Sequence, residues 1–330
     1  MRASVFIPTS NRMAPLRKCL DSLTNQSNSE FAILLVGLEK NEKISKLIKK
    51  YKKLTIEHII QKQPGIVDAA NIALKYASYD FFIRIDDDVI TDKNWFQNII
   101  KTFDSDKKIV GVTGPTIMSE DDVHARDLTH YLHVWGNSTN PLHIIPHLLY
   151  VNILYENKMM EPSQILQSGA FTIGSNYTTS TKLKNSIEAT NLEACNFAVR
   201  TSALKKLGGF NRLYRKGLGD YHEAEMAQQI KSKKLHLVFN PKVLTRHNVR
   251  STTMSSKSRG ASFWRIQNFI LFWMRNQNPK TVSATFRFLT NVILQNAYYG
   301  YKCFSTKNVC ELGAIPGTFV GFVRAPFHRV

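Results

Sequence analysis

Apolar runs alternate regularly with amphipathic segments over the first 115 residues. The apolar runs have the length and composition of buried strands, and they lie at 4–8, 31–38, 55–60, 81–85 and 108–114. The segments between them carry apolar residues at helical spacing, at 16–23, 44–54, 67–76 and 92–103. This β-α-β order predicts an open α/β sheet, mostly parallel, with helices on both faces.

Three successive carboxylates, Asp86, Asp87 and Asp88, directly follow the apolar run at 81–85. In an open sheet, ligands bind beyond the carboxyl ends of the strands. Adjacent carboxylates repel one another unless a positive charge neutralises them, and oxygen ligands favour Mg²⁺ or Mn²⁺. An acidic turn that caps the next helix is the alternative. The fully apolar strand before the triplet favours the metal site.

Other polar residues and glycines stand at the ends of predicted elements. They are Pro8, Thr9, Asn11, Arg12, Gly65, Asn71 and His247. The loop at 8–12 could receive a nucleotide on its backbone amides and arginine, although an ordinary turn has the same composition. Helix capping explains Gly65 and Asn71 equally well. A lone histidine is more often structural than a ligand, but His247 follows a predicted strand at 235–239, where a further metal ligand could converge.

The motifs occur in a fixed order along the chain. They are Pro8-Thr-Ser-Asn-Arg12, Gly65 with Asn71, Ile85-Asp86-Asp87-Asp88, Cys195-Asn196, Gly208-Gly209-Phe210-Asn211 and His247. This set resembles glycosyltransferase family 2, whose members are inverting enzymes with the Rossmann-like GT-A fold. The resemblance covers residues 3–115 and 190–270. It implies a UDP- or GDP-sugar as donor and Mg²⁺ or Mn²⁺ as cofactor.

The resemblance also implies roles for individual residues. Thr9 and Arg12 would lie beside the nucleotide, and Asp86 would contact its uridine or ribose. Asp88 would bind the metal that holds the donor diphosphate, with His247 as a further ligand. The other expected substrate-binding residues are Pro8, Asn11, Gly65, Asn71, Asp87 and Asn196.

The catalytic base is where this sequence departs from the family pattern. The family has an acidic pair, usually Glu-Asp, at the start of the helix that follows the Gly-Gly-Phe turn. Here the segment reads Gly219-Asp-Tyr-His-Glu-Ala-Glu225. Counting back from Asn240 places the base at Glu223, whereas the position after the glycine points to Asp220. In either register a carboxylate would accept the acceptor's proton as its oxygen attacks the anomeric carbon.

The charge of the chain is unevenly distributed. Of the formal net charge of +19, residues 231–330 carry +15, with 16 Lys and Arg and a single acid, Glu311. The tail from residue 262 reads as two or three helices in which these charges alternate with aromatics, namely Phe263, Trp264, Phe269, Phe272, Trp273, Phe286 and Phe288. This mixture predicts in-plane attachment to an anionic membrane. The alternative is that the aromatics pack the helices onto the catalytic domain.

Together these patterns predict one GT-A domain with an extension. Residues 1–115 would form the half that binds the nucleotide sugar, 116–255 the acceptor-binding and catalytic half, and 256–330 the basic helical tail. Four scattered cysteines and the absence of a signal-peptide pattern predict a cytoplasmic enzyme on the inner face of a membrane. A lipid-linked glycan is the expected acceptor, with a polysaccharide or a protein side chain as alternatives.

Three other functions compete with this interpretation. A magnesium-dependent nucleotidyltransferase would share the fold class and the metal, but its Gly-rich N-terminal loop is missing. A haloacid-dehalogenase-like phosphatase would normally begin with the acidic motif, which here follows three earlier strands. A nucleic-acid-binding protein would match a pI of about 9.8, yet the chain has no zinc-finger spacing and no aromatic strand of the RNA-binding type.

Overall fold

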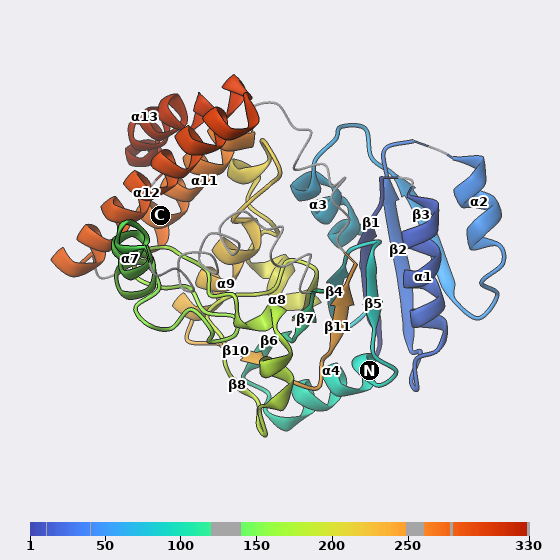
Figure 1. Ribbon diagram of the computed structural model, residues 1–330. Helices are drawn as coiled ribbons and strands as arrows, with labels where there is room; N and C mark the ends of the chain where they lie inside the picture. Colours follow the sequence, from blue (N-terminus) through green and yellow to red (C-terminus); the bar gives the residue numbers. More distant parts are fainter. Residues whose placement is uncertain (11, 40, 120–139, 249–260, 278–279, 329–330) are drawn as a thin grey trace.

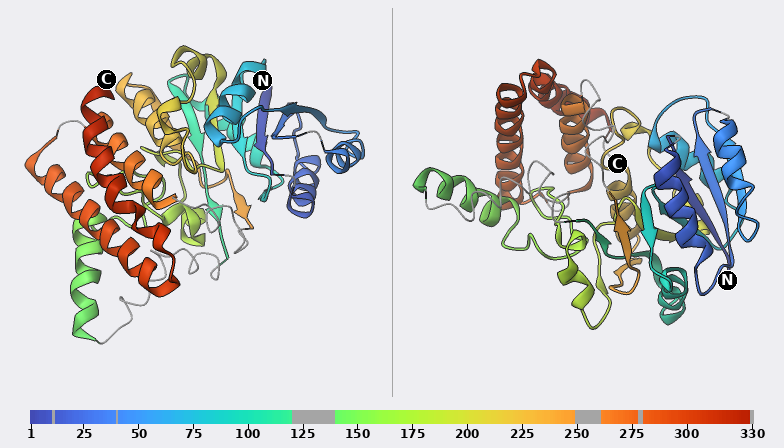
Figure 2. Two further views of the ribbon diagram at one scale, coloured as in Figure 1. Left: turned by 90° about the horizontal axis from the view of Figure 1, so that it is seen from above. Right: turned by 45° about the vertical axis from the view of Figure 1, so that its right-hand side comes forward.

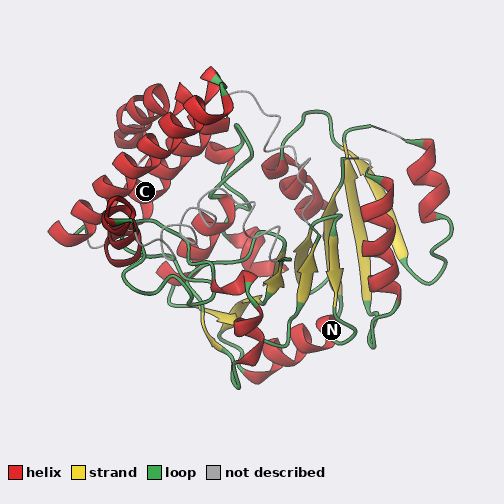
Figure 3. Ribbon diagram, viewed as in Figure 1, coloured by secondary structure: helices red, strands yellow, loops and turns green. Residues whose placement is uncertain are grey.

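The computed structural model describes residues 1–10, 12–39, 41–119, 140–248, 261–277 and 280–328. Its centre is an eight-stranded sheet in the order β3-β2-β1-β4-β9-β6-β10-β8 (Figures 1 and 3). The strands are β1 (Ala3–Pro8), β2 (Phe31–Gly37), β3 (Thr55–Ile60), β4 (Phe81–Ile85), β6 (Ile109–Thr113), β8 (Ile187–Glu188), β9 (Asn196–Arg200) and β10 (His236–Phe239). Strands β3, β2, β1 and β4 run parallel, β9 is antiparallel to both its neighbours, and β10 is parallel to β6. The mostly parallel sheet is therefore confirmed.

Helices cover both faces of this sheet (Figure 1). They are α1 (Met13–Thr24), α2 (Glu42–Ile48), α3 (Ile66–Tyr76), α4 (Trp95–Ser105), α8 (Thr201–Lys206) and α9 (His222–Ser232). Because successive side chains of a strand point to opposite faces, each strand contributes to two cores. In β1, Phe6 packs in one hydrophobic cluster, while Val5 and Ile7 pack in the other. This double burial explains why β1, β2 and β4 are almost continuously apolar.

A smaller sheet extends the carboxyl edge of the first. It contains β5 (Val89–Thr91), β11 (Thr245–His247) and β7 (Thr116–Ile117) in the order β5-β11-β7. Strand β5 begins directly after the acidic triplet, and its antiparallel pairing sets Val89 opposite His247. The small sheet thus brings a residue from late in the chain to the end of β4.

The C-terminal region is helical, as expected. Helices α11 (Ala261–Asn276), α12 (Val282–Thr306) and α13 (Ala314–Arg324) share a hydrophobic cluster of their own (Figure 2). Helix α7 (Pro141–Leu148) continues into a π-helical segment at Leu149–Leu154 that packs against α12. Backbones approach closely at Gly317, where an added Cβ would lie 2.4 Å from the carbonyl oxygen of Phe263. No described helix combines the length and the hydropathy that crossing a membrane requires.

The tail aromatics do not lie where a membrane-facing role would put them. Phe269, Phe272, Trp273 and Phe288 are buried, and the rings of Trp273 and Phe288 stack with centroids 3.9 Å apart. Of the seven aromatics that the sequence suggested for membrane contact, only Phe286 is exposed. Helical packing therefore accounts for most of them, because the large rings fill the space between α11 and its neighbours.

Candidate active site

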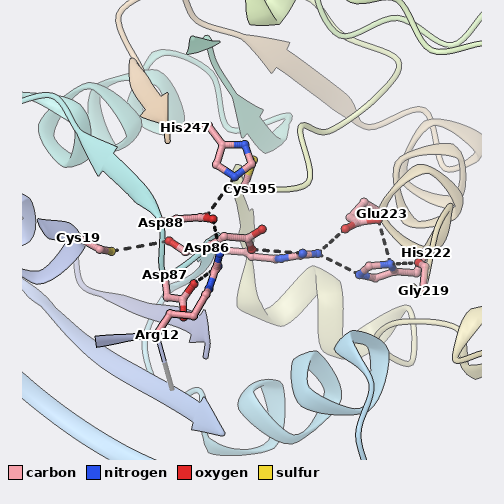
Figure 4. Close-up of polar contacts among 11 residues, drawn as sticks. Arg12, Cys19, Asp86, Asp87, Asp88, Cys195, Gly219, His222, Glu223 and His247 are labelled. Atoms are coloured by element: carbon pink, nitrogen blue, oxygen red, sulfur yellow. Dashed lines mark hydrogen bonds and ion pairs between the residues drawn. The ribbon is translucent and has the colours of Figure 1, made fainter. Parts of the chain in front are cut away.

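The acidic triplet lies at the carboxyl edge of the main sheet, where β4 ends (Figure 4). Asp87 and Asp88 are buried. Arg12, which follows β1, forms ion pairs with both, and its Nη1 lies 2.8 Å from Asp88 Oδ2. The hydroxyl of Thr9 donates a hydrogen bond to Asp87 Oδ2 at 2.8 Å. The loop after β1 therefore neutralises part of the charge that the triplet concentrates.

The two buried carboxyls respond differently to this environment. Burial raises the pKa of Asp87, although Arg12 and Thr9 oppose the effect. Burial would also raise the pKa of Asp88, but His247 and Arg12 outweigh it, so the pKa falls below its usual value. Asp88 is thus held as a carboxylate, the form that a cation requires.

His247 lies next to the triplet, as the sequence suggested. Its Nε2 is 3.1 Å from Asp88 Oδ1, and its Nδ1 is 3.8 Å from the sulfur of Cys195. One ligand atom from each of Asp86, Cys195 and His247 lies within 4.8 Å of the other two. With Asp88, the cluster offers two carboxylates, an imidazole and a thiol, a donor set that fits a divalent transition metal.

Cys195 is a candidate metal ligand that sequence reasoning missed. The antiparallel register pairs Ile85 of β4 with Asn196 of β9, so the residues beyond that pair, Asp86 and Cys195, come side by side. The signal that could have identified Cys195 was the Cys195-Asn196 motif, in which only the asparagine was given an expected role. The side chain of Asn196 is fully buried and bonded to Trp95, Pro115 and Val243.

A second polar cluster lies on the other side of Asp86 (Figure 4). Arg84 of β4 forms a close ion pair with Glu223 at the start of α9, and its Nη1 lies 3.1 Å from His222 Nε2. The Nη2 of the same guanidinium is 3.4 Å from Asp86 Oδ1. Burial would raise the pKa of Glu223, but the charges of His222 and Arg84 outweigh it and lower the pKa to about 2. One buried arginine therefore joins the triplet to the first candidate for the base.

Sequence reasoning also missed Arg84. It is the single charged residue in the strand FFIRI and is buried there. A buried charge requires a partner of opposite sign, and this requirement was the signal that could have predicted the ion pair with a carboxylate.

The three acids of the α9 segment have separate partners. Asp220 Oδ1 accepts a hydrogen bond from Arg265 Nε of α11 at 3.3 Å, and within the described part of the chain its buried Oδ2 has no hydrogen-bond partner. Glu225 binds Arg275 at 2.9 Å and also contacts Tyr214, Asn211 and Asn276. Through Arg275 and Asn276, Glu225 attaches α11 to α9. Glu223 and Asp220 stay the candidates for the base.

Two of the remaining expected residues, Pro8 and Gly65, lie at the ends of elements near the same edge. Gly65 precedes α3 with φ +139°, and Pro8 ends β1. The side chain of Asn71 binds the backbone N–H and C=O of Phe210, at 2.9 and 2.8 Å, and so fastens the Gly-Gly-Phe turn to α3. Asn11 lies outside the described residues. Direct contact of any of these residues with a substrate stays a prediction.

Two further polar groups stand near the end of β2. An added Cβ on Gly37 would lie 3.4 Å from Thr9 Cγ2 and 3.5 Å from His58 Nε2. Within the described ranges, His58 Nε2 and Gln61 Oε1 are buried without a hydrogen-bond partner. Burial lowers the pKa of His58. A buried acceptor without a partner costs free energy unless a ligand supplies the missing hydrogen bond.

Comparison with known proteins identifies the family of this chain. The family model described as "Glycosyl transferase family 2" matches residues 4–208. The chain belongs to glycosyltransferase family 2. It is 31% identical over 116 residues to the chondroitin synthase of Pasteurella multocida (strain Pm70), a match that covers 34% of this chain and 12% of that protein. The hyaluronan synthase of Pasteurella multocida is 31% identical over 114 residues, which are 33% of this chain and 12% of the synthase. The chain thus matches about an eighth of the length of these relatives.

Solved structures show that this glycosyltransferase has the GT-A fold. Residues 1–349 of TarS from S. aureus superpose with a TM-score of 0.58 at 13% identity, covering 98% of this chain and 81% of that one. The mannosyltransferase PcManGT from Pyrobaculum calidifontis, in complex with GDP-Man and Mn²⁺, gives 0.53 at 12% identity and covers 99% and 87%. GalNAc-T7 with UDP, GalNAc and Mn²⁺ gives 0.58 at 14%, covering 82% and 47%. The resemblance and the fold predicted from the motifs are therefore confirmed.

Proposed function

We propose that this glycosyltransferase moves a sugar from a UDP- or GDP-sugar to an acceptor hydroxyl, with inversion at the anomeric carbon. The observation that carries the proposal is the convergence of the acidic triplet, His247 and Glu223 at one edge of the sheet, linked by Arg84. In this proposal residues 1–115 bind the donor, 116–255 bind the acceptor and supply the base, and 256–330 form the basic helical tail, whose helices we call the helical unit.

The donor half supports a nucleotide. Arg12 is charged and half-exposed, so it can meet a phosphate while it pairs with Asp88. The buried Gln61 Oε1 can accept a hydrogen bond from an N–H of a base, which both uracil and guanine offer. The solved complexes of TarS with UDP-GlcNAc and of PcManGT with GDP-Man are consistent with either nucleotide.

Asp88 and His247 would hold the metal ion, with Asp86 and Cys195 in reach. We propose Mn²⁺ rather than Mg²⁺, because imidazole and thiol groups suit a softer cation than Mg²⁺, which prefers oxygen ligands and water. The ion, when bound, offsets the negative charge that develops on the departing nucleoside diphosphate.

Glu223 is the first choice for the base. It is ionised at neutral pH, and it lies in the same polar network as Asp86. A carboxylate with a pKa of about 2 is a weak base, so full basicity requires that Arg84 move from it when the donor diphosphate offers a competing anion. Asp220 is the second choice, because Arg265 ties it to α11 and not to the network of Asp86, even though its Oδ2 has no hydrogen-bond partner among the described residues.

An isosteric pair of variants tests this assignment. Glu223→Gln removes the proton acceptor without changing the shape of the side chain, so we expect transfer to fall by about 10³-fold or more while donor affinity changes little. Asp220→Asn is the matched control and should keep most of the activity. Initial rates and donor affinity from calorimetric titration give the two readouts. Loss of transfer in Asp220→Asn with an active Glu223→Gln would reverse the assignment.

We further propose a glycan acceptor carried by a lipid at an anionic membrane. The two Pasteurella relatives are named for polysaccharide synthesis, which supports a sugar hydroxyl as the acceptor. The charge of +15 over residues 231–330 supports a cytoplasmic membrane face that carries anionic lipids.

A further inference from the structure

Helices α12 and α13 expose apolar side chains that take no part in the packing between the tail helices. Six of these side chains are each at least 59% exposed. Within α12 they recur at separations that keep them on one side of the helix, and in α13 they are one turn apart. They define what we name the α12–α13 face: Val282, Phe286, Ile293, Phe304, Ile315 and Phe319.

The exposed sides of both helices point away from α11. The opposite side of α12 packs on α11 through Phe288 and Val292, and α13 packs on α11 through Gly317 and Gly321. The two helices also contact each other, since Asn296 Nδ2 donates to Thr318 Oγ1 at 2.9 Å (Figure 2). The six side chains therefore form one surface on the outer side of the helical unit.

The charged residues within and beside α12 indicate what kind of partner the α12–α13 face would contact. In α12 the only charged residues are Arg287, which donates to the carbonyls of Asn152 and Ile153, and Lys302, which pairs with Glu311. The apolar stripe therefore carries no charge along 25 residues, about 37 Å of helix. The exposed Lys280 and Lys307 flank α12 at its two ends.

The helices that carry the face are themselves basic, with five Lys and Arg against the single acid Glu311 over residues 280–328, which disfavours the other obvious partners. A second copy of the chain would bring the same basic residues to the contact and no acid to pair with the exposed Lys280 and Lys307, so the contact would be disfavoured. Nucleic acid would match the charge but would leave the apolar residues uncovered. An anionic bilayer satisfies both, with apolar side chains at the acyl boundary and lysines among the headgroups.

We propose that the α12–α13 face docks in the plane of an anionic membrane. This inference rests on the proposed function, in which the acceptor is carried by a membrane lipid. It names the surface of the protein that would contact that membrane. The helical unit is fastened to the catalytic segment, because Arg265 of α11 binds Asp220 and Tyr221 packs against Phe269 and Phe272. Docking would therefore hold the segment that carries the base at a defined height above the lipid.

The test is co-sedimentation of the full chain with vesicles of phosphatidylcholine containing about one-third phosphatidylglycerol, and with vesicles of phosphatidylcholine alone. The face variant carries Phe286→Gln, Ile293→Gln and Phe319→Gln. The control variant carries three similar changes at exposed apolar positions elsewhere, Tyr76→Gln, Met160→Gln and Leu183→Gln. Because all six positions are exposed, both variants should keep the wild-type thermal unfolding midpoint within a few degrees.

We expect the wild type and the control variant to bind anionic vesicles, and the face variant to bind at least about tenfold more weakly. Binding to phosphatidylcholine alone should also be about tenfold weaker. Equal binding by the face variant, or no binding by the wild type, would overturn the proposal. So would a wild-type dimer that the face variant abolishes, because a second copy would then occupy the face.

A separate readout distinguishes failure of this inference from failure of the proposed function. Hydrolysis of a sugar nucleotide without vesicles should be the same in the face variant and the wild type, because the changes lie away from the catalytic residues. Hydrolysis that persists while the wild type ignores vesicles would reject only the docking surface. Vesicle binding without hydrolysis of any donor would reject the proposed activity and leave the docking surface standing.

Discussion

The buried ion pair between Arg84 and Glu223 yields the most quantitative prediction. Both side chains are almost inaccessible to solvent. The fall in the pKa of Glu223 from 4.5 to about 2 corresponds to about 3 kcal/mol of net preference for the ionised form. His222 lowers this pKa more than Arg84 does, so we take the coupling between Arg84 and Glu223 from the usual range for residues in contact, about 0.5–3 kcal/mol. Removing one partner of a buried pair also leaves a charge uncompensated, which costs about 3–5 kcal/mol.

The predicted effect of Arg84→Met is therefore a loss of about 3–5 kcal/mol in the free energy of unfolding at neutral pH. Combining it with Glu223→Gln should recover about 0.5–3 kcal/mol relative to the sum of the single changes. Urea unfolding followed by circular dichroism measures all four proteins. Glu225→Gln combined with Arg84→Met is the matched control, because Glu225 lies on the same helix but binds Arg275. That pair should be additive within about 0.5 kcal/mol.

The pH dependence has a definite sign. The folded-state pKa of Glu223 lies below its unfolded value, so its stabilisation is complete above about pH 5 and is lost as the pH falls toward 2. Without Arg84 the pKa of Glu223 rises, so the cost of Arg84→Met should be largest at neutral pH and smaller at about pH 4. A coupling below about 0.5 kcal/mol, or a cost that grows on acidification, would refute this account of the pair.

Two further predictions concern the residues that support the site. Gly209 has φ +79°, and an added Cβ would lie 2.5 Å from Asn71 Oδ1, so Gly209→Ala should destabilise by about 3 kcal/mol in thermal or urea unfolding. Gly208→Ala, at φ +83° with open space around it, is the control and should cost about 1 kcal/mol; equal costs would contradict the role of the Asn71 contact. Trp95→Phe removes the donor 2.9 Å from the buried Asn196 Oδ1, so we expect a loss of about 2 kcal/mol. A change under about 0.5 kcal/mol would show that this hydrogen bond between α4 and β9 contributes little to stability.

Much of the fold could be predicted because its strands are buried on both faces. A strand such as β4, with every residue buried, must be apolar throughout, and that pattern is visible in a single sequence. The acidic triplet was equally visible, since three adjacent carboxylates after such a strand have few structural uses. Its position at the carboxyl edge followed from the β-α-β order alone.

The remainder depended on strand register and side-chain packing, which a sequence does not display. Cys195 reaches the cluster only because β9 runs antiparallel beside β4, and the expected parallel order does not predict that pairing. The tail shows the same limit. Phe288 and Phe286 are two residues apart on one helix, yet Phe288 is buried and Phe286 exposed, and only the position of α11 determines which.

The reaction proposed for this site is metal-dependent release of a nucleoside diphosphate from a sugar nucleotide. The most direct measurement incubates the chain with a panel of UDP- and GDP-sugars and Mn²⁺ or Mg²⁺, and identifies the nucleotide product by chromatography. We predict a nucleoside diphosphate from one donor, lost with a chelator and reduced by about 10³-fold or more in Asp88→Ala. The circular dichroism of this variant at the assay temperature should match that of the wild type, although the lost pairs with Arg12 and His247 lower its thermal midpoint. Release that is unaffected by the chelator and by Asp88→Ala, or formation of pyrophosphate from a sugar phosphate and a nucleoside triphosphate, would contradict the account.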